Sequence, residues 1–229
     1  IALLAEAPDV SAAQVVADVT VGDYTDPQTV YDFAARCDAI TFDHEHVPQP
    51  ILRGLIERGK VVHPGPDALV HAQDKVVMRQ RLSSIGVPCP LFEVVDGPDE
   101  LIAFGARTGW PVIAKTSRGG YDGKGVWKVD GPDGAAEPFA ALRPGVRILA
   151  EEFIDFSREL SVLVARRPSG EERVYPVTET VQTAGICTHT FTPAAQLTDA
   201  QRDDLEGLAL RIAAELGVTG ILAVELMQR

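Results

Sequence analysis

Four glycines and two lysines fall within one short segment that lies between two stretches of strand type. The segment reads Lys115-Thr-Ser-Arg-Gly-Gly-Tyr-Asp-Gly-Lys-Gly-Val126. Glycine lets backbone N–H groups approach and wrap a phosphate. A P-loop is excluded, because no glycine stands five residues before Gly123 and no Ser or Thr follows Lys124. The pattern predicts a flexible hairpin that can fold over a triphosphate, with an ordinary glycine-rich turn as the alternative.

Two charged residues sit in apolar surroundings, where an unpaired charge is costly. Lys115 follows the apolar residues 111–114, so it either binds an anion or reaches water from the strand end. Glu225 lies within the apolar run 221–227. It is either at the surface of an edge strand or bound to a hard cation, and Mg²⁺ is the natural ion where phosphates are near.

A third segment combines an apolar strand with carboxylates. Residues 149–154 run from apolar residues into the pair Glu151-Glu152 and back, and Glu159 opens the next strand. Such a hinge can offer backbone groups to an adenine edge while a carboxylate eight residues further on holds ribose hydroxyls. For these residues alone, a solvated acidic turn is the simpler interpretation.

The order of helical and strand-like patterns predicts an α/β chain. Helices at about 27–36 and 50–58, each followed by a short apolar run, indicate the later part of a parallel, doubly wound sheet. Asp74 is placed to cap a helix through Leu82, and residues 86–90 form a linker. Beyond it we expect strands at 112–116, 126–129, 147–151, 160–165, 173–178, 186–192 and 221–226, and helices at 99–107, between 129 and 147, and from Thr198 onward.

Composition narrows the class of protein. The 229 residues are 45% apolar and 24% charged, as in a globular chain, and carry a net charge of −12. A general nucleic-acid binder needs a basic face, so that class is excluded. No run approaches the roughly 18 apolar residues of a membrane span, and no signal peptide is apparent, so we expect a cytoplasmic protein. Three scattered cysteines are expected to be reduced. The chain opens on Ile1 and closes on Arg229 after a strand-like run, so we expect residues beyond both ends.

In order and spacing these segments resemble the ATP-grasp ligases, and most closely the 5-(carboxyamino)imidazole ribonucleotide synthases of purine biosynthesis. The resemblance covers nearly the whole chain. It is carried by Cys37-Asp-Ala-Ile-Thr-Phe-Asp-His-Glu-His-Val-Pro48, Gln73-Asp-Lys75, the segment 119–125, Glu151-Glu-Phe-Ile-Asp-Phe-Ser-Arg-Glu-Leu-Ser161 and Gly220-Ile-Leu-Ala-Val-Glu225. The Gly-Gly-Tyr-Asp-Gly-Lys-Gly form and the Glu-x-Val-Pro segment are the narrowest of these motifs.

The resemblance implies an α/β and α+β chain with an ATP-grasp fold and a partial Rossmann-like N-terminal domain. The implied units are residues 1–66, a pre-ATP-grasp domain; 67–88, a linker helix region; 89–152, a lid subdomain with a glycine flap; and 153–229, a truncated C-terminal subdomain.

The resemblance also implies roles for individual residues, with ATP and Mg²⁺ as cofactors. Lys75 and Lys115 would contact ATP phosphates beneath a flap of Gly120, Tyr121, Asp122, Gly123, Lys124, Gly125 and Val126. Glu151, Glu152, Phe153 and Ile154 would line adenine, Glu159 would hold ribose and Gln182 would lie near the nucleotide. Tyr121, Asp122 and Lys124 would also face the acceptor, and catalysis would rest on them and Lys115. Glu225 would be one of two magnesium ligands, the other lying beyond the chain.

The implied reaction is the ATP-dependent carboxylation of aminoimidazole ribonucleotide with bicarbonate through carboxyphosphate, in a homodimer that binds neither nucleic acid nor membrane. On this basis Lys115→Ala should abolish activity with little loss of fold. Asp43, Thr180 and Gln182 depart from the family's usual Glu, Asn and His, which puts the acceptor pocket in question. The alternatives are another ATP-grasp ligase with a different acceptor, and a nucleotide-binding protein that has lost catalysis.

Overall fold

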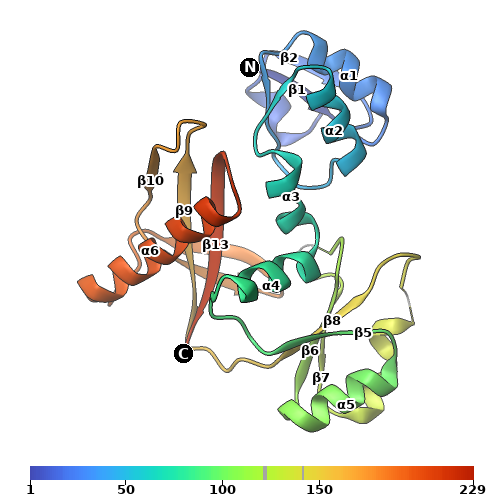
Figure 1. Cartoon of the computed structure of the whole chain (residues 1–229), viewed down its shortest axis with the longest axis vertical. Helices are drawn as coiled ribbons and strands as arrows, with labels where there is room; N and C mark the ends of the chain where they lie inside the picture. The colour runs from blue at the N-terminus through green and yellow to red at the C-terminus, as the bar shows by residue number, and fades with distance from the viewer. Residues whose placement is uncertain (121–122, 141) are drawn as a thin grey trace.

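The computed structural model describes residues 1–120, 123–140 and 142–229, which form three lobes around a central helix (Figure 1). The N-terminal lobe is blue, the lobe in green and yellow carries the glycine segment, and the third lobe is orange and red. Each lobe has its own apolar core.

The N-terminal lobe is built of short parallel strand pairs and two helices. Strands β1 (Ala2–Ala5) and β2 (Asp18–Val21) pair with each other, as do β3 (Ala39–Ile40) and β4 (Val61–Val62), and the helices are α1 (Pro27–Ala35) and α2 (Gln49–Glu57). Leu52 and Leu55 of α2 are fully buried in the core of this lobe. The strands are parallel as predicted, but they form two separate pairs instead of one sheet.

Two helices in sequence connect the lobes. They are α3 (Pro66–Gln73) and α4 (Lys75–Ser84). Asp74 stands between them and caps α4, because its Oδ1 accepts hydrogen bonds from the backbone N–H groups of Val76 and Val77. The cap that the sequence predicts is therefore confirmed. Leu82 of α4 packs against Ile212, Leu222 and Val224, which ties the central helix to the third lobe.

The second lobe is an antiparallel sheet with one helix on it. Its strands, in the order β5-β8-β6-β7, are β5 (Phe92–Val95), β8 (Ile148–Glu152), β6 (Val112–Thr116) and β7 (Val126–Val129), and α5 (Pro98–Thr108) covers one face. The helix predicted between β7 and β8 is wrong. The residues described there, 130–140 and 142–147, form only two single 3-10 turns, Pro132–Gly134 and Glu137–Phe139, because closely spaced prolines and glycines interrupt any longer helix.

The third lobe is a second antiparallel sheet, backed by a long helix. Its strands are β9 (Arg158–Arg166), β10 (Glu172–Val174), β11 (Thr178–Thr183), β12 (Ile186–Phe191) and β13 (Gly220–Gln228), and its helix is α6 (Asp199–Glu215). The strand predicted at 173–178 is instead divided at Pro176, which has no N–H to donate. A helix is expected from Thr198 onward, and in the structure Thr198 caps α6, which packs on buried residues of β9.

Within the described parts of the chain, no helix has the length and apolar character needed to span a membrane.

Candidate functional site

The sheet of the third lobe presents carboxylates on the face that α6 leaves uncovered. Leu160, Val162 and Val164 of β9 are buried with α6, so the alternate residues Glu159 and Ser161 point to the other face. In the antiparallel register Ser161 lies opposite Glu225 of β13, and Glu159 lies opposite Thr180 of β11. Because directly opposed residues share a face, Glu159, Thr180 and Glu225 line one side of the site.

The sheet of the second lobe presents a buried ion pair on the face away from α5. Lys115 of β6 and Glu151 of β8 share that face, since Ile113 is paired with Glu151 and Lys115 with Leu149. Lys115 Nζ lies 2.5 Å from Glu151 Oε2, and Arg79 of α4 bonds the other carboxylate oxygen through Nε. The Glu151 side chain is only 3% exposed. Burial alone would raise the pKa of Glu151, but the charges of Lys115 and Arg79 outweigh it and lower that pKa below its ordinary value.

The first turn of α4 is tied to the base of the glycine segment. The backbone N–H of Lys75 donates to Ser117 O at 2.8 Å, and Lys75 Nζ donates to Gly119 O at 3.2 Å. Arg118 Nε bonds Asp74 Oδ2 at 2.8 Å. Burial, followed by the charge of Lys115, lowers the pKa of Lys75. The two lysines predicted to contact phosphates are thus close enough to repel each other.

The glycine segment crosses itself at its base. Gly120 has a φ of 82°, and a Cβ added there would lie 2.5 Å from Lys124 O. Gly125 has a φ of 71°, and its added Cβ would lie 2.5 Å from Thr116 Oγ1. Side chains are excluded at both positions by backbone conformation and by space. Gly123 lies against Ala184 and Gly185 at the tip of the β11–β12 hairpin, so the segment reaches toward the third lobe.

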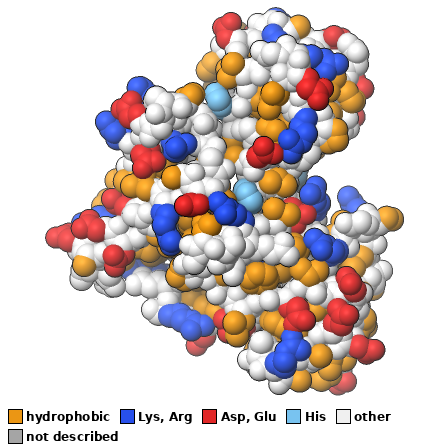
Figure 2. Space-filling view, viewed as in Figure 1, with side chains coloured by type: hydrophobic (Ala, Val, Ile, Leu, Met, Phe, Trp, Pro, Cys, Tyr) orange, Lys and Arg blue, Asp and Glu red, His pale blue; other side chains and the backbone are white. Residues whose placement is uncertain are grey.

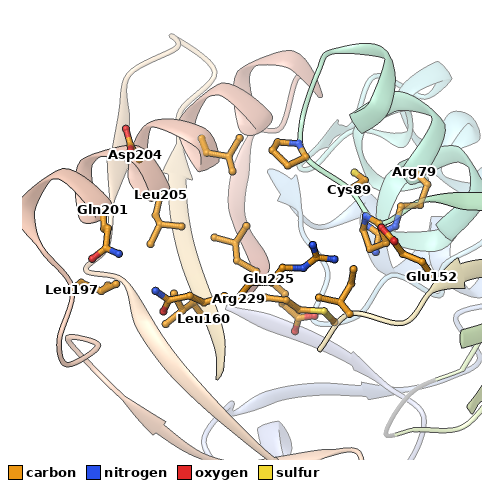
Figure 3. Close-up of a pocket in the computed structure, with 17 residues that line it drawn as sticks. Arg79, Cys89, Glu152, Leu160, Leu197, Gln201, Asp204, Leu205, Glu225 and Arg229 are labelled. Atoms are coloured by element: carbon orange, nitrogen blue, oxygen red, sulfur yellow. The ribbon is translucent and has the colours of Figure 1, made fainter. Parts of the chain in front are cut away.

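Two adjoining cavities are bordered by five of the predicted site residues. The smaller, about 420 Å³, is bordered by Lys115, Glu159, Thr180 and Glu225 together with α3 and α4. The larger, about 620 Å³, wraps around β13, and Figure 3 shows Arg79, Cys89 and Glu152 at one end and residues of α6 at the other. Arg79, Glu225, Leu226 and Met227 border both cavities.

The remaining predicted site residues lie at varied distances from these cavities. Glu152 and Ile154 border the larger cavity, whereas Phe153 packs against Lys128, whose Nζ lies 5.1 Å from the ring centroid. Lys124 and Val126 are exposed. Gln182 is exposed on β11 at an irregularity in its pairing with β12. Tyr121 and Asp122 lie outside the described residues.

Arg79 is the site residue that sequence reasoning missed. It lies one helical turn after Lys75 on α4, so both side chains point toward the same region. That spacing is the signal that could have identified it, given that Asp74 was already placed at the start of the helix. Its acidic partner could not have been found, because the two residues are 72 positions apart.

Carboxylates suited to a metal ion are few. No group of three or more His, Cys, Asp or Glu side chains able to hold a metal occurs among the described residues. Glu225 and Glu159 nevertheless share one cavity and offer oxygen ligands. Mg²⁺ is commonly bound by one or two carboxylates together with substrate phosphates, so the donor set fits that ion.

The charged side chains show no general anion-binding surface. In Figure 2 the Lys and Arg side chains are scattered among Asp and Glu side chains and form no continuous basic face on the side shown. The cations that converge, Lys75, Lys115 and Arg79, do so beside the cavities.

Comparison with known proteins agrees with this geometry. The family model for the ATP-grasp domain matches residues 80–229, and the model for the ribonucleotide synthetase preATP-grasp domain matches residues 1–73. The N5-carboxyaminoimidazole ribonucleotide synthase of Corynebacterium ammoniagenes is 47% identical over 98% of this chain. The match covers 54% of that relative, so the chain spans about half the length of the curated relatives it matches.

Solved structures share the fold. The N5-carboxyaminoimidazole ribonucleotide synthetase of Thermus thermophilus superposes with a TM-score of 0.88 at 33% identity, over 98% of this chain and 60% of that one. The synthase of Aspergillus clavatus, in complex with ADP and 5-aminoimidazole ribonucleotide, superposes with a TM-score of 0.84 at 26% identity, over 96% of this chain and 57% of that one. With two sheets bordering one cavity and a family match over 80–229, more than half of its length, the chain belongs to the ATP-grasp family.

Proposed function

We propose that the protein containing this chain uses ATP and bicarbonate to carboxylate 5-aminoimidazole ribonucleotide, forming 5-(carboxyamino)imidazole ribonucleotide, ADP and phosphate in purine biosynthesis. The observation that carries the proposal is the placement of Lys115 across one cavity from Glu159 and Glu225. It occurs in a chain 47% identical to a synthase of that name.

The site residues are assigned to the nucleotide as follows. Lys75 and Lys115 bind phosphates, since Lys115 borders the smaller cavity and Lys75 lies close enough to interact with its charge. Residues 151–154 run along the adenine, with Glu152 and Ile154 bordering the larger cavity, and Glu159 binds ribose. Gly120, Gly123, Gly125 and Val126 cover the phosphates as part of the flap. Gln182 is assigned near the nucleotide, and Tyr121, Asp122 and Lys124 near the acceptor.

The chemistry proceeds in two substitutions. An oxygen of bicarbonate attacks the γ-phosphorus of ATP, the bond to the bridging oxygen breaks, and ADP leaves. The exocyclic amine of the ribonucleotide then attacks the carbon of carboxyphosphate, loses a proton and displaces phosphate. The protein contributes position and charge: Lys115 and Lys124 offset the negative charge of the transferring phosphoryl group, and a closed flap excludes water from the intermediate.

Glu225 is the proposed ligand for Mg²⁺ from this chain. When bound, the ion offsets charge on the ATP phosphates. The chain's own residues keep the phosphates near it, because Lys115 borders the same cavity and Lys75 lies close to Lys115.

Release of ADP by the full-length protein tests the proposal. It should require Mg²⁺ and bicarbonate, and it should rise strongly when 5-aminoimidazole ribonucleotide is added. Bicarbonate-dependent release that ignores this ribonucleotide would keep the ATP-grasp assignment and assign another acceptor. Absence of release, with ATP still bound, would favour the non-catalytic alternative.

Three further assignments rest on the same proposal. The partners are small molecules and a second copy of the protein, which light scattering would detect as a homodimer. Nucleic acid is not a partner, in keeping with the net charge of −12. A purine-forming ligase of this kind is placed in the cytoplasm, which fractionation of cells would test.

A further inference from the structure

Glu151 is a buried carboxylate that forms ion pairs with two cations from different secondary-structure elements. Lys115 approaches it along β6 from the same sheet, and Arg79 approaches from α4. The Glu151 side chain is 3% exposed, and those of both cations are 18% exposed. A buried carboxylate with no cation is strongly destabilised, so at least one of the two must stay in place.

The two cations differ in what else they can reach. Lys115 borders the smaller cavity beside Glu159 and Glu225, where its flexible stem allows the ammonium to turn toward a phosphate. Arg79 borders both cavities but is held through Nε, the nitrogen nearest its stem, against the carboxylate. In a protein that lacks Arg79, movement of Lys115 to a phosphate would leave Glu151 with an unpaired charge in a site shielded from water.

We propose that Arg79 is a positioning residue that keeps Glu151 ionised and in place while Lys115 leaves it to bind the nucleotide's phosphates. The inference rests on the proposed function, since it needs a nucleoside triphosphate in the smaller cavity. It adds a residue to the site and gives that residue a role. Arg79 stays paired with Glu151 while Lys115 exchanges this carboxylate for a phosphate of the nucleotide.

Other titratable groups around Glu151 do not replace Arg79. Lys75 is near enough to interact with Glu151, but its Nζ is directed to Gly119 O, and burial together with Lys115 already lowers its pKa. Cys89 also lies near, and burial raises the pKa of its thiol, so it offers no positive charge. Arg79 is therefore the cation that remains when Lys115 moves.

Binding of MgATP to the full-length protein provides the test, measured by titration calorimetry in two buffers of different ionisation enthalpy. In Arg79→Met, Lys115 can leave Glu151 only if the carboxylate takes up a proton. We expect uptake of up to about one proton beyond that of the wild type, because a buried unpaired carboxylate has a strongly raised pKa. The affinity for MgATP at pH 8 should fall by about ten- to a hundredfold, which corresponds to a shift of about one to two units in the pKa of the carboxyl group. At pH 6 the affinity should recover in part.

Two companion variants separate this role from a merely structural one. Arg79→Lys keeps the charge, so its affinity and proton uptake should resemble the wild type. In a Glu151→Gln background the carboxylate is absent, so adding Arg79→Met should change MgATP affinity by less than about threefold. The comparison of Glu151→Gln with the double variant still tests the role of Arg79 if Arg79→Met alone does not fold.

The outcomes distinguish the inference from the proposed function. Equal proton uptake in the wild type and Arg79→Met, or an equal loss of affinity with and without Glu151, would overturn the role of Arg79 and leave ATP binding intact. Failure of the wild type itself to bind MgATP would overturn the proposed function.

Discussion

Lys115 and Glu151 are ion-paired across neighbouring strands of the same sheet, with Nζ 2.5 Å from Oε2. The lysine that the sequence singles out as needing an anion therefore has one in the ligand-free protein, and that anion is a protein side chain. Any phosphate that Lys115 binds competes with Glu151. Under the proposed phosphate-binding role of Lys115, the balance between these two anions would determine how strongly the site holds nucleotide, and this is why the third residue, Arg79, is proposed to matter.

Lys115→Ala should abolish ATP-dependent ADP release and also weaken the fold. The second effect revises the expectation from sequence, because the variant leaves Glu151 with only Arg79. We expect a loss of about 2 kcal/mol in the free energy of unfolding, less than the roughly 3–5 kcal/mol seen when a buried charge loses its only partner. Chemical denaturation and an ADP-release assay measure the two effects. Lys128→Ala is the matched control on β7 and should leave activity intact; normal turnover in Lys115→Ala would refute the phosphate assignment.

Glu151→Gln should be less stable than the wild type at neutral pH, by an amount that disappears in acid. The folded-state pKa of Glu151 lies below its ordinary value of 4.5, so its stabilising charge is present above that pH and lost as the pH falls through the folded pKa. The stability difference should be constant from about pH 6 to 8 and shrink below about pH 4.5. Urea denaturation across this range measures it. A difference that grows in acid would contradict the assigned direction of the shift.

Local signals made several elements predictable from the sequence. Asp74 and Thr198 begin helices because each is a capping residue followed by a helical pattern, and both caps occur in the structure. Strand β6 has the bounds predicted for it, since an apolar run ends at a polar, glycine-rich segment. The predicted helix between β7 and β8 is wrong because closely spaced prolines and glycines interrupt that stretch.

Long-range relationships could not be predicted in the same way. The contact between Arg79 and Glu151 depends on how α4 packs across the second lobe, which no local pattern encodes. Sequence reasoning did place Glu159 and Glu225 near one ligand, and the register of β9 and β13 puts both on one face. The domain boundaries at 66, 88 and 152 and the roles of individual site residues remain predictions.

Gly120→Ala should impair turnover far more than Gly119→Ala. Both glycines have positive φ, so each substitution carries a backbone cost of roughly 1–2 kcal/mol. Among the described residues, the new Cβ at Gly120 would also meet a backbone atom, Lys124 O at 2.5 Å, whereas the new Cβ at Gly119 would have no neighbour within 4 Å. The crossing of the flap base should therefore be lost in Gly120→Ala alone. Turnover and thermal unfolding of the pair measure this, and equal effects would show that close packing at the flap base is unimportant.

Glu225→Gln should raise the Mg²⁺ concentration needed for half-maximal ADP release by about tenfold. A neutral amide is a weaker ligand for a hard cation than a carboxylate. The fold should be little changed, since Glu225 is exposed on β13. Asp203→Asn, which removes an exposed carboxylate on α6, is the control for the change in net charge. An unchanged Mg²⁺ dependence in Glu225→Gln would remove this residue from the proposed metal site.

Lys75→Met should weaken MgATP binding by about tenfold without destabilising the ligand-free protein. Burial and the charge of Lys115 lower the pKa of Lys75, so the fold disfavours its charged form. The contribution of Lys75 to the free energy of unfolding consequently rises as the pH increases through its folded pKa toward 10.5. At neutral pH the charge of Lys75 destabilises the folded protein. Removing it should leave the free energy of unfolding unchanged or raise it by up to about 1 kcal/mol.

Lys60→Met is the contrasting control for Lys75→Met. Lys60 Nζ donates to Ala35 O at 2.9 Å and to Cys37 O at 3.3 Å near the end of α1, and Lys60 borders neither cavity. Its loss should lower stability by about 1 kcal/mol and leave MgATP affinity unchanged. Denaturation and calorimetry of both variants should therefore give opposite patterns. If Lys75→Met lost as much stability as Lys60→Met and kept full affinity, Lys75 would be a structural residue and not a phosphate ligand.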